Sequence, residues 1–233
     1  INVTGLPAGV NSIVSGNTVT ISGTPTTTTG SPFNYTISTS GGSCGTISLN
    51  GTITVNPAVS LALTSATSTT NQIVCANIAI FPITYTFGNG ATGYTITGLP
   101  AGVSHTVSGN TITINGAPTS TTGSPFSYSI STTGGSCGTA TLNGTITVNP
   151  SPTLVLNSTV ATTNQSICIN TSINPISYTF GGSATGVTVS GLPTGMSSIV
   201  SGNTVTITGT PTTATGSPFN YTVTTSGGSC GTI

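Results

Sequence analysis

Apolar and polar residues alternate along several short segments of this chain. Phe33, Tyr35 and Ile37 alternate with polar residues, and the segment Ile83–Phe87 repeats the arrangement. A period of two is typical of a β-strand with one buried face. Thr, Val, Ile and Tyr, which favour strands, dominate these segments. Since no ten-residue stretch has helical spacing with capping residues, the pattern predicts an all-β fold.

The same sequence returns along the chain at a fixed interval. G-L-P begins at Gly5, Gly98 and Gly191, which are 93 residues apart. This period is longer than the roughly 20–50 residues of solenoid repeats. It matches one small all-β domain of about 100 residues. The period therefore predicts a tandem array of β-sandwich domains with about seven strands in each repeat.

Two kinds of turn punctuate the strands. Asn50-Gly51 and Asn143-Gly144 lie between alternating runs, and Asn-Gly supplies the positive φ angles of a two-residue hairpin turn. A second turn, S-G-N, begins at Ser15 and returns in both later repeats. We expect a hairpin at each of these places.

Proline marks the expected joints between domains. Pro57 and Pro150 each close a V-N-P motif, and a new apolar run follows. Proline does not continue a central strand. We therefore expect three domains, called here the first, second and third repeats: 1–57, which lacks its opening strands; 58–150, which is complete; and 151–233, which lacks its last strand. Both chain ends then fall inside domains, as in a window from a longer repetitive protein.

The chain contains no Lys, Arg, Asp or Glu and a single His. There are no carboxylates for acid–base catalysis or for binding Ca²⁺ or Mg²⁺, and no basic surface for nucleic acid. No apolar run is long enough to insert into a membrane. Charged residues ordinarily protect edge strands, and a net charge near zero promotes association. The composition predicts a protein without enzymatic activity, cofactor or metal, whose partners include further copies of itself.

Five cysteines follow the repeat. Cys75 lies near the start and Cys137 near the end of the complete repeat, so we expect the disulfides Cys75–Cys137 and Cys168–Cys230. Cys44 would then pair with a cysteine outside the window. The alternative is Cys44–Cys75 and Cys137–Cys168, which would join neighbouring domains. Regular disulfides are typical of exported proteins in an oxidising place.

The remaining candidates for chemistry are weak. His105 is the only general-base candidate, but Ser12 and Ser198 stand at its equivalent positions and no acid is present to orient it. A surface substitution explains it. Met196 stands where Val10 and Val103 stand, as a core or near-core replacement.

The repeat also resembles a known group of proteins. The pattern N-Q-I-V-C-A-N, I-T-Y-T-F, T-G-L-P-A-G-V, G-T-P-T, G-G-S-C-G-T and G-T-I-T-V is similar to the tandem Ig-like repeats of giant Bacteroidota cell-surface proteins of the gliding-motility-adhesin type. This resemblance covers the whole chain. It implies Ig-like sandwiches, a dedicated secretion route, an extended surface fibre and the same intradomain cysteine pairing, and it carries no catalytic residues.

These observations together predict a structural repeat of an extracellular bacterial surface filament or adhesin stalk. Disulfide-locked sandwiches would act as mechanical spacers, with neighbouring repeats and other copies of the chain as partners. The alternative is an adhesin module that binds glycan, ice or another surface. Loops that vary between repeats would favour this alternative, and the loops here vary little.

Overall fold

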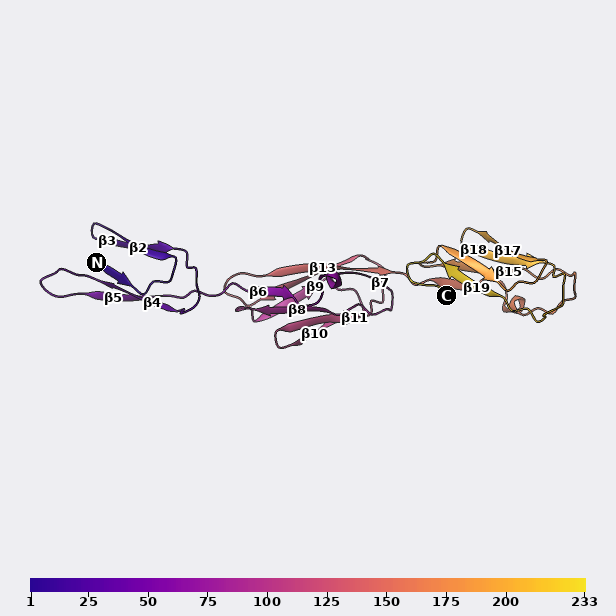
Figure 1. Cartoon of the computed structure of the whole chain (residues 1–233), viewed down its shortest axis with the longest axis horizontal. Coiled ribbons are helices and arrows are strands. Elements are labelled where there is room, and N and C mark those ends of the chain that lie inside the picture. The colour runs from indigo at the N-terminus through magenta and orange to yellow at the C-terminus, as the bar shows by residue number, and fades with distance from the viewer. The chain divides into compact units, whose positions relative to one another are not determined.

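The computed structural model describes all 233 residues and is almost entirely β-structure (Figure 1). It has nineteen strands and two single-turn 3₁₀-helices, η1 (Thr67–Thr70) and η2 (Val160–Thr163). The chain divides into two compact units. The first consists of Ile1–Ala62, Thr86–Thr95 and Ile130–Leu142. The second consists of Leu63–Tyr85, Ile96–Ser129 and Asn143–Ile233. Since this division runs through the second repeat, the joints expected at Pro57 and Pro150 stay predictions.

The second repeat forms two four-stranded sheets. One has the order β10-β11-β8-β6, and its strands are β10 (Val103–Ser108), β11 (Thr111–Gly116), β8 (Ile83–Gly88) and β6 (Ser60–Leu63). The other has the order β7-β13-β12-β9, and its strands are β7 (Asn71–Cys75), β13 (Thr141–Asn149), β12 (Phe126–Thr133) and β9 (Gly93–Thr97). β7 runs parallel to β13, with Asn71 opposite Thr145 and Cys75 opposite Asn149.

The alternation in sequence becomes alternation in burial. Along β8 the residues Ile83, Tyr85 and Phe87 are buried and the residues between them are partly exposed. β11, β12 and β13 each bury alternate residues in the same way. Ile146 and Val148 of β13 are 0% and 2% exposed, so β13 contributes directly to the core.

The first repeat has five strands. They form a sheet of order β1-β4-β5, with β1 (Asn2–Thr4), β4 (Phe33–Ser38) and β5 (Ser48–Ile53), and a hairpin of β2 (Val10–Ser15) and β3 (Thr18–Gly23). β5 is an edge strand here. Ile53 at the end of β5 and Val55 just after it, which correspond to Ile146 and Val148, are only partly buried.

The third repeat has a four-stranded and a two-stranded sheet. The first has the order β14-β15-β18-β17, with β14 (Thr153–Leu156), β15 (Ile176–Gly181), β18 (Thr204–Gly209) and β17 (Met196–Ser201). The second pairs β16 (Gly186–Ser190) with β19 (Thr222–Ser226). Segment 164–168, which corresponds to β7, forms no strand here because its partner, the counterpart of β13, is not among the 233 residues.

The expected turns are only partly correct. The S-G-N hairpin is confirmed, since Gly16 has φ +56° between β2 and β3. The Asn-Gly hairpin is wrong, because Asn50-Gly51 lies inside β5 and Asn143-Gly144 inside β13. Glycine is required there for close approach: a Cβ on Gly144 would lie 2.3 Å from Tyr128 Oη.

Candidate functional site

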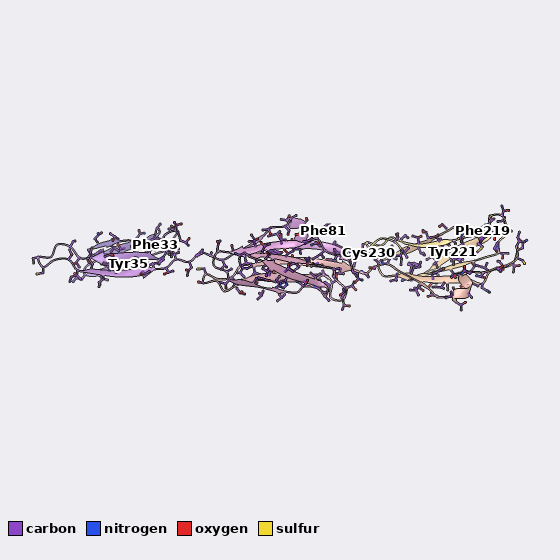
Figure 2. The ribbon with its side chains drawn as sticks, turned by 90° about the horizontal axis from the view of Figure 1, so that it is seen from below. Phe33, Tyr35, Phe81, Phe219, Tyr221 and Cys230 are labelled. Atoms are coloured by element: carbon purple, nitrogen blue, oxygen red, sulfur yellow. A yellow bond between two sulfur atoms is a disulfide. The ribbon has the colours of Figure 1, made fainter.

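A disulfide joins the second repeat to the third. Cys75, the last residue of β7, is bonded to Cys230 in the loop that follows β19, with their Cα atoms 5.6 Å apart (Figure 2). The two residues are 155 positions apart in sequence. Loss of chain entropy in a closed loop of that size stabilises the folded state by about 5 kcal/mol. The bond is a covalent connection between consecutive repeats.

Hydrogen bonds lie close to the Cys75–Cys230 disulfide, and one of them connects the second repeat to the third. Asn149 Nδ2 donates to Ser229 Oγ at 3.0 Å, across the joint. Ser151 Oγ donates to the carbonyl oxygen of Ala76 at 3.3 Å, and Ala76 N donates to Asn149 O at 2.9 Å. The hydrogen bonds at the joint are therefore made by amide, hydroxyl and backbone groups.

This pairing corrects the expected one. Neither Cys75–Cys137 nor Cys168–Cys230 is present, and the alternative of Cys44 with Cys75 is not present either. Cys75 lies opposite Asn149, the last residue of β13, whereas Cys137 precedes Thr141, its first residue. The nine residues of β13 extend over about 27 Å, so Cys75 and Cys137 lie near opposite ends of this strand. A disulfide needs Cα atoms within roughly 7 Å.

Cys137 occupies the place in the second repeat that Cys230 occupies in the third. The sulfur of Cys137 lies 3.4 Å from the carbonyl oxygen of Asn56. In the same way, the sulfur of Cys230 lies 3.9 Å from the carbonyl oxygen of Asn149. Asn56 and Asn149 are themselves one period apart. Three cysteines are free and exposed, namely Cys44, Cys137 and Cys168.

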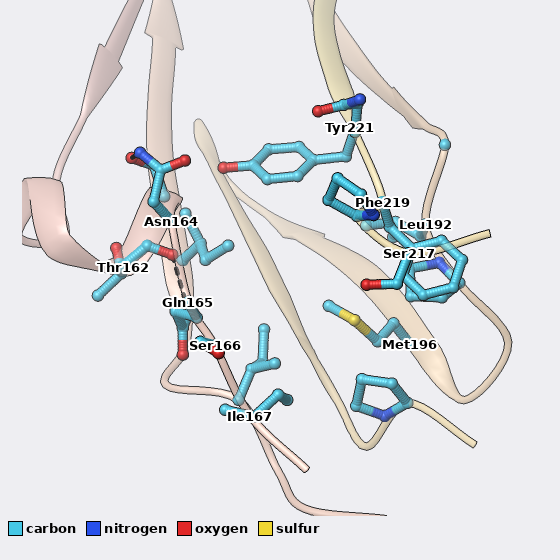
Figure 3. Close-up of a pocket in the computed structure, with 18 of the residues that line it drawn as sticks. Thr162, Asn164, Gln165, Ser166, Ile167, Leu192, Met196, Ser217, Phe219 and Tyr221 are labelled. Carbon is cyan, nitrogen blue, oxygen red and sulfur yellow. Dashed lines mark hydrogen bonds between the residues drawn. The ribbon is translucent and has the colours of Figure 1, made fainter. Parts of the chain in front are cut away.

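An open pocket of about 890 Å³ lies in the third repeat. Figure 3 shows its two walls: segment 162–167 forms one, and Leu192, Met196 and segment 217–221 form the other. These walls correspond to the surroundings of β7 and β12 in the second repeat, where β13 lies between them. We call this pocket the open strand position.

One wall of the open strand position is already ordered by a glutamine. Gln165 Nε2 donates to Thr162 O and Asn174 O, and Gln165 Oε1 accepts from Asn174 N, each at 2.8 Å. Gln72 makes the same three hydrogen bonds in the second repeat, where β13 is present. The wall therefore keeps the conformation it has beside a paired strand. The sequence analysis missed this role of glutamine, although an Asn-Gln pair begins four residues before Cys75 and again four residues before Cys168.

Tyrosine pairs lie beside the strand position in both repeats. Tyr85 and Tyr128 share a hydroxyl–hydroxyl hydrogen bond of 3.0 Å and are 0% and 1% exposed. Burial raises the pKa of Tyr85 and of Tyr128, and their mutual hydrogen bond adds to the rise at Tyr128. Tyr178 and Tyr221 form the same bond at 2.8 Å, and burial raises the pKa of Tyr221. The phenols of Tyr85, Tyr128 and Tyr221 therefore stay neutral where free tyrosine ionises.

Each repeat also presents a hairpin strand at a sheet edge. β2 pairs only with β3, and β10 and β17 are the edge strands of their sheets. The exposed large apolar residues on these three strands are Ile13, Val14, Val107, Ile199 and Val200. No charged side chain is present to keep such an edge from pairing with another chain.

The two other candidate residues from the sequence are His105 and Met196. His105 is exposed on β10, opposite Ile114. Met196 begins β17 and is half-buried in the wall of the open strand position. No group of three His, Cys, Asp or Glu side chains is placed to hold a metal ion. No helix is long and apolar enough to cross a membrane.

No known protein family and no curated protein matches this chain. Solved structures do match. Three Ig domains of titin are 12% identical, with a TM-score of 0.58 over 97% of this chain and 80% of that one. The four-domain protocadherin gamma B7 ectodomain fragment is 10% identical, with a TM-score of 0.44 over 97% and 63%. A fucoidan hydrolase of glycoside hydrolase family 107 is 17% identical, with a TM-score of 0.31 over 100% and 37%.

Of these three structures, only the titin domains are close enough to support an argument, and at their sequence identity the likeness concerns the fold alone. It agrees with the paired sheets of the second repeat and with the recurrence of the same strands in the other two. The chain is an array of tandem Ig-like β-sandwich repeats.

Proposed function

We propose that this chain is an exported, non-enzymatic structural protein whose repeats form part of a bacterial surface filament or adhesin stalk. The observation that carries the proposal is the Cys75–Cys230 bond, which fastens one sandwich to the next. A covalent joint suits a load-bearing spacer in an oxidising extracellular place. The bacterial surface enters through the resemblance of the repeat to Bacteroidota adhesins.

Self-association is part of the proposed function, with other copies of the chain as the partner. The edge strands β2, β10 and β17 expose apolar residues, and the chain has no charge to oppose contact between copies. Contacts of this kind are nearly independent of salt, because no ion pairs take part in them. The filament would therefore hold together over a wide range of ionic strength.

Electron microscopy of the purified chain with a mass-per-length measurement tests the proposal. We expect fibres with several chains in each axial repeat. Introducing lysine at the three edge positions, Val14→Lys, Val107→Lys and Val200→Lys, should disperse these fibres. The control places three lysines on exposed loops (Thr29→Lys, Thr122→Lys and Thr215→Lys) and should leave the fibres intact.

Either of two results would contradict the proposal. One is a chain that stays monomeric at every concentration and salt level. The other is a chain that does not form fibres but binds a glycan or an ice surface, which would favour the surface-binding module instead.

A further inference from the structure

The outer strand of the S-G-N hairpin lies at a sheet edge in the second and third repeats alike. In the third repeat this strand is β17, which ends the sheet of order β14-β15-β18-β17. In the second repeat it is β10, which ends the corresponding sheet of order β10-β11-β8-β6, and that repeat has all of its strands. The edge position is therefore a property of the repeat itself.

The backbone of β17 has groups that are directed away from its own sheet. The loop between β17 and β18 has two residues, so Ser201 and Thr204 form the hydrogen-bonded pair that closes the hairpin. Hydrogen-bonded and non-hydrogen-bonded pairs alternate along an antiparallel ladder. The amide and carbonyl groups of Ser198 and Val200 therefore point away from β18. Both residues are exposed, so another strand can reach these groups.

The side chains of β17 do not protect this edge. Ile199 and Val200 at its centre are 64% and 49% exposed, and serines lie on either side of them. Soluble proteins ordinarily guard an edge strand with charged residues, proline or a bulge. β17 has no charged residue and no proline, and its register with β18 is unbroken. The strand therefore lacks the features that keep two chains from pairing.

We propose that β17 pairs with β17 of a second copy of the chain, in the antiparallel direction and centred on Ile199. The inference rests on the proposed function, because it names the strand, direction and register through which copies associate. Ile199 lies opposite Ile199 of the second copy, and Ser198 lies opposite Val200. Each Ser198–Val200 pair exchanges two N–H···O hydrogen bonds, so the two four-stranded sheets become one continuous sheet.

Two neighbouring registers keep the same faces together but meet obstacles. A register centred one residue earlier would need the amide of Met196, which already donates to Pro193 O at 3.1 Å. A register centred one residue later would extend into Gly202, which has φ +56° in the hairpin turn. The register centred on Ile199 avoids both obstacles.

A second copy of the chain is the partner that suits this edge. The two Ile199 side chains would meet at a non-hydrogen-bonded position, where facing residues approach most closely, and a pair of apolar side chains across two strands stabilises a sheet. Neither copy has a charged side chain, so no like charges are brought together. Two-fold contacts between identical surface patches are also the commonest way in which copies of one chain assemble.

A single strand pair is a small contact, and the chain carries this edge more than once. A pair of six-residue strands is smaller than the roughly 1,200–2,000 Å² of a stable interface. The segment Ser12–Ile21 of the first repeat is identical in sequence to Ser198–Ile207. Weak contacts reinforce one another when one molecule carries several of them. Association should therefore rise steeply with concentration.

Cysteine cross-linking of the full chain tests the strand and its register. The background variant keeps the Cys75–Cys230 bond and replaces the three exposed cysteines, as Cys44→Ser, Cys137→Ser and Cys168→Ser. Ile199→Cys in this background should form a disulfide-linked dimer when diamide is added as the oxidant. Facing residues at a non-hydrogen-bonded position have Cα atoms about 4.5 Å apart, which is within the range of a disulfide.

Ser198→Cys and Val200→Cys test the direction of the pair. Neither variant should dimerise alone, because each position faces the other across the pair, whereas a mixture of the two variants should give the cross-linked dimer. In a parallel pair without stagger each variant would cross-link alone. Thr206→Cys is the matched control, because Thr206 lies on β18 directly beside Ile199 on the same face, and it should not dimerise.

Three results would overturn the inference: no dimer from Ile199→Cys, a dimer from Val200→Cys alone, or equal dimer formation by Thr206→Cys. Fibres seen by electron microscopy without cross-linking at Ile199 would refute this register and leave the proposed function standing. A chain that stays monomeric would refute both. The two failures are therefore distinguishable.

Discussion

The buried hydroxyl pair of the second repeat makes a strong test of how this uncharged core is held together. Tyr85 and Tyr128 are almost fully buried, and each hydroxyl lies 3.0 Å from the other. Changing Tyr128→Phe leaves the hydroxyl of Tyr85 buried without this partner. Such a group costs about 1–3 kcal/mol of folding free energy. Tyr85→Phe should have a similar cost.

The double variant is expected to behave differently from the sum of the two single variants. When both hydroxyls are replaced by apolar groups of nearly the same shape, no polar group is left unsatisfied, and the net cost becomes small. The double-mutant cycle should therefore give a coupling energy close in size to the sum of the two single costs.

Amide hydrogen exchange of second-repeat residues is the appropriate assay, because a chain of several domains need not unfold in one step. The opening free energy read at Ile112 and Ile146 should fall in each single variant and recover in the double variant. Tyr178→Phe in the third repeat is the control. Its pair is partly exposed, so water can replace the lost partner, and exchange at Ile112 and Ile146 should not change.

The reasoning would be refuted by unchanged exchange in Tyr128→Phe. It would also be refuted by a double variant whose cost equals the sum of the two single costs. Either result would mean that the two hydroxyls do not depend on each other.

Three other predictions follow from the core and the cysteines. Gly144→Ala should destabilise the second repeat by about 1–3 kcal/mol in chemical denaturation, because its Cβ would meet Tyr128 Oη. Gly42→Ala is the control and should be nearly neutral, because its Cβ would meet nothing closer than 3.6 Å. Alkylation and mass spectrometry of the dilute monomer should find three labelled cysteines before reduction and five after it; a single label would favour intradomain pairing. Stability measured by circular dichroism should hardly change in acid, because the chain has no carboxylate side chains. Stability should fall above about pH 10, because tyrosines of the unfolded chain ionise there while the raised pKa of Tyr128 keeps its phenol protonated in the folded state. Constant stability up to about pH 12 would contradict the raised pKa of Tyr128.

The strand pattern of the fold followed from local sequence. Alternation at Ile83, Tyr85 and Phe87 predicted a strand with those three residues buried, and all three are. The S-G-N hairpins were equally local, because a positive φ at Gly16 depends on a few neighbouring residues. The second repeat has eight strands, close to the seven or so expected.

The glycine of the Asn-Gly motif was misinterpreted because its reason is not local. Gly144 lies in the middle of β13 and is small so that the ring of Tyr128 can approach it. A turn and a close approach both select glycine. Only the position of a tyrosine on the neighbouring strand distinguishes them, and a single sequence does not contain that position.

The disulfide was misassigned for a related reason. Cys137 and Cys230 are one period apart, so the repeat pattern offers both equally as partners for Cys75. The choice depends on which end of the sandwich each cysteine occupies. That follows from the direction of β7 relative to β13, and the parallel pairing of these strands brings Cys75 to the end where the next repeat begins.

The position of the bond has a consequence for how the chain would respond to tension. A pull between the two chain ends enters Cys75 and leaves through Cys230, so the segment between them carries no covalent load. With a separation of 155 residues and about 3.4 Å of extended chain for each residue, the bond withholds roughly 500 Å of contour length. Reduction would release that length, so the redox state of a single bond sets how far the chain extends before it breaks.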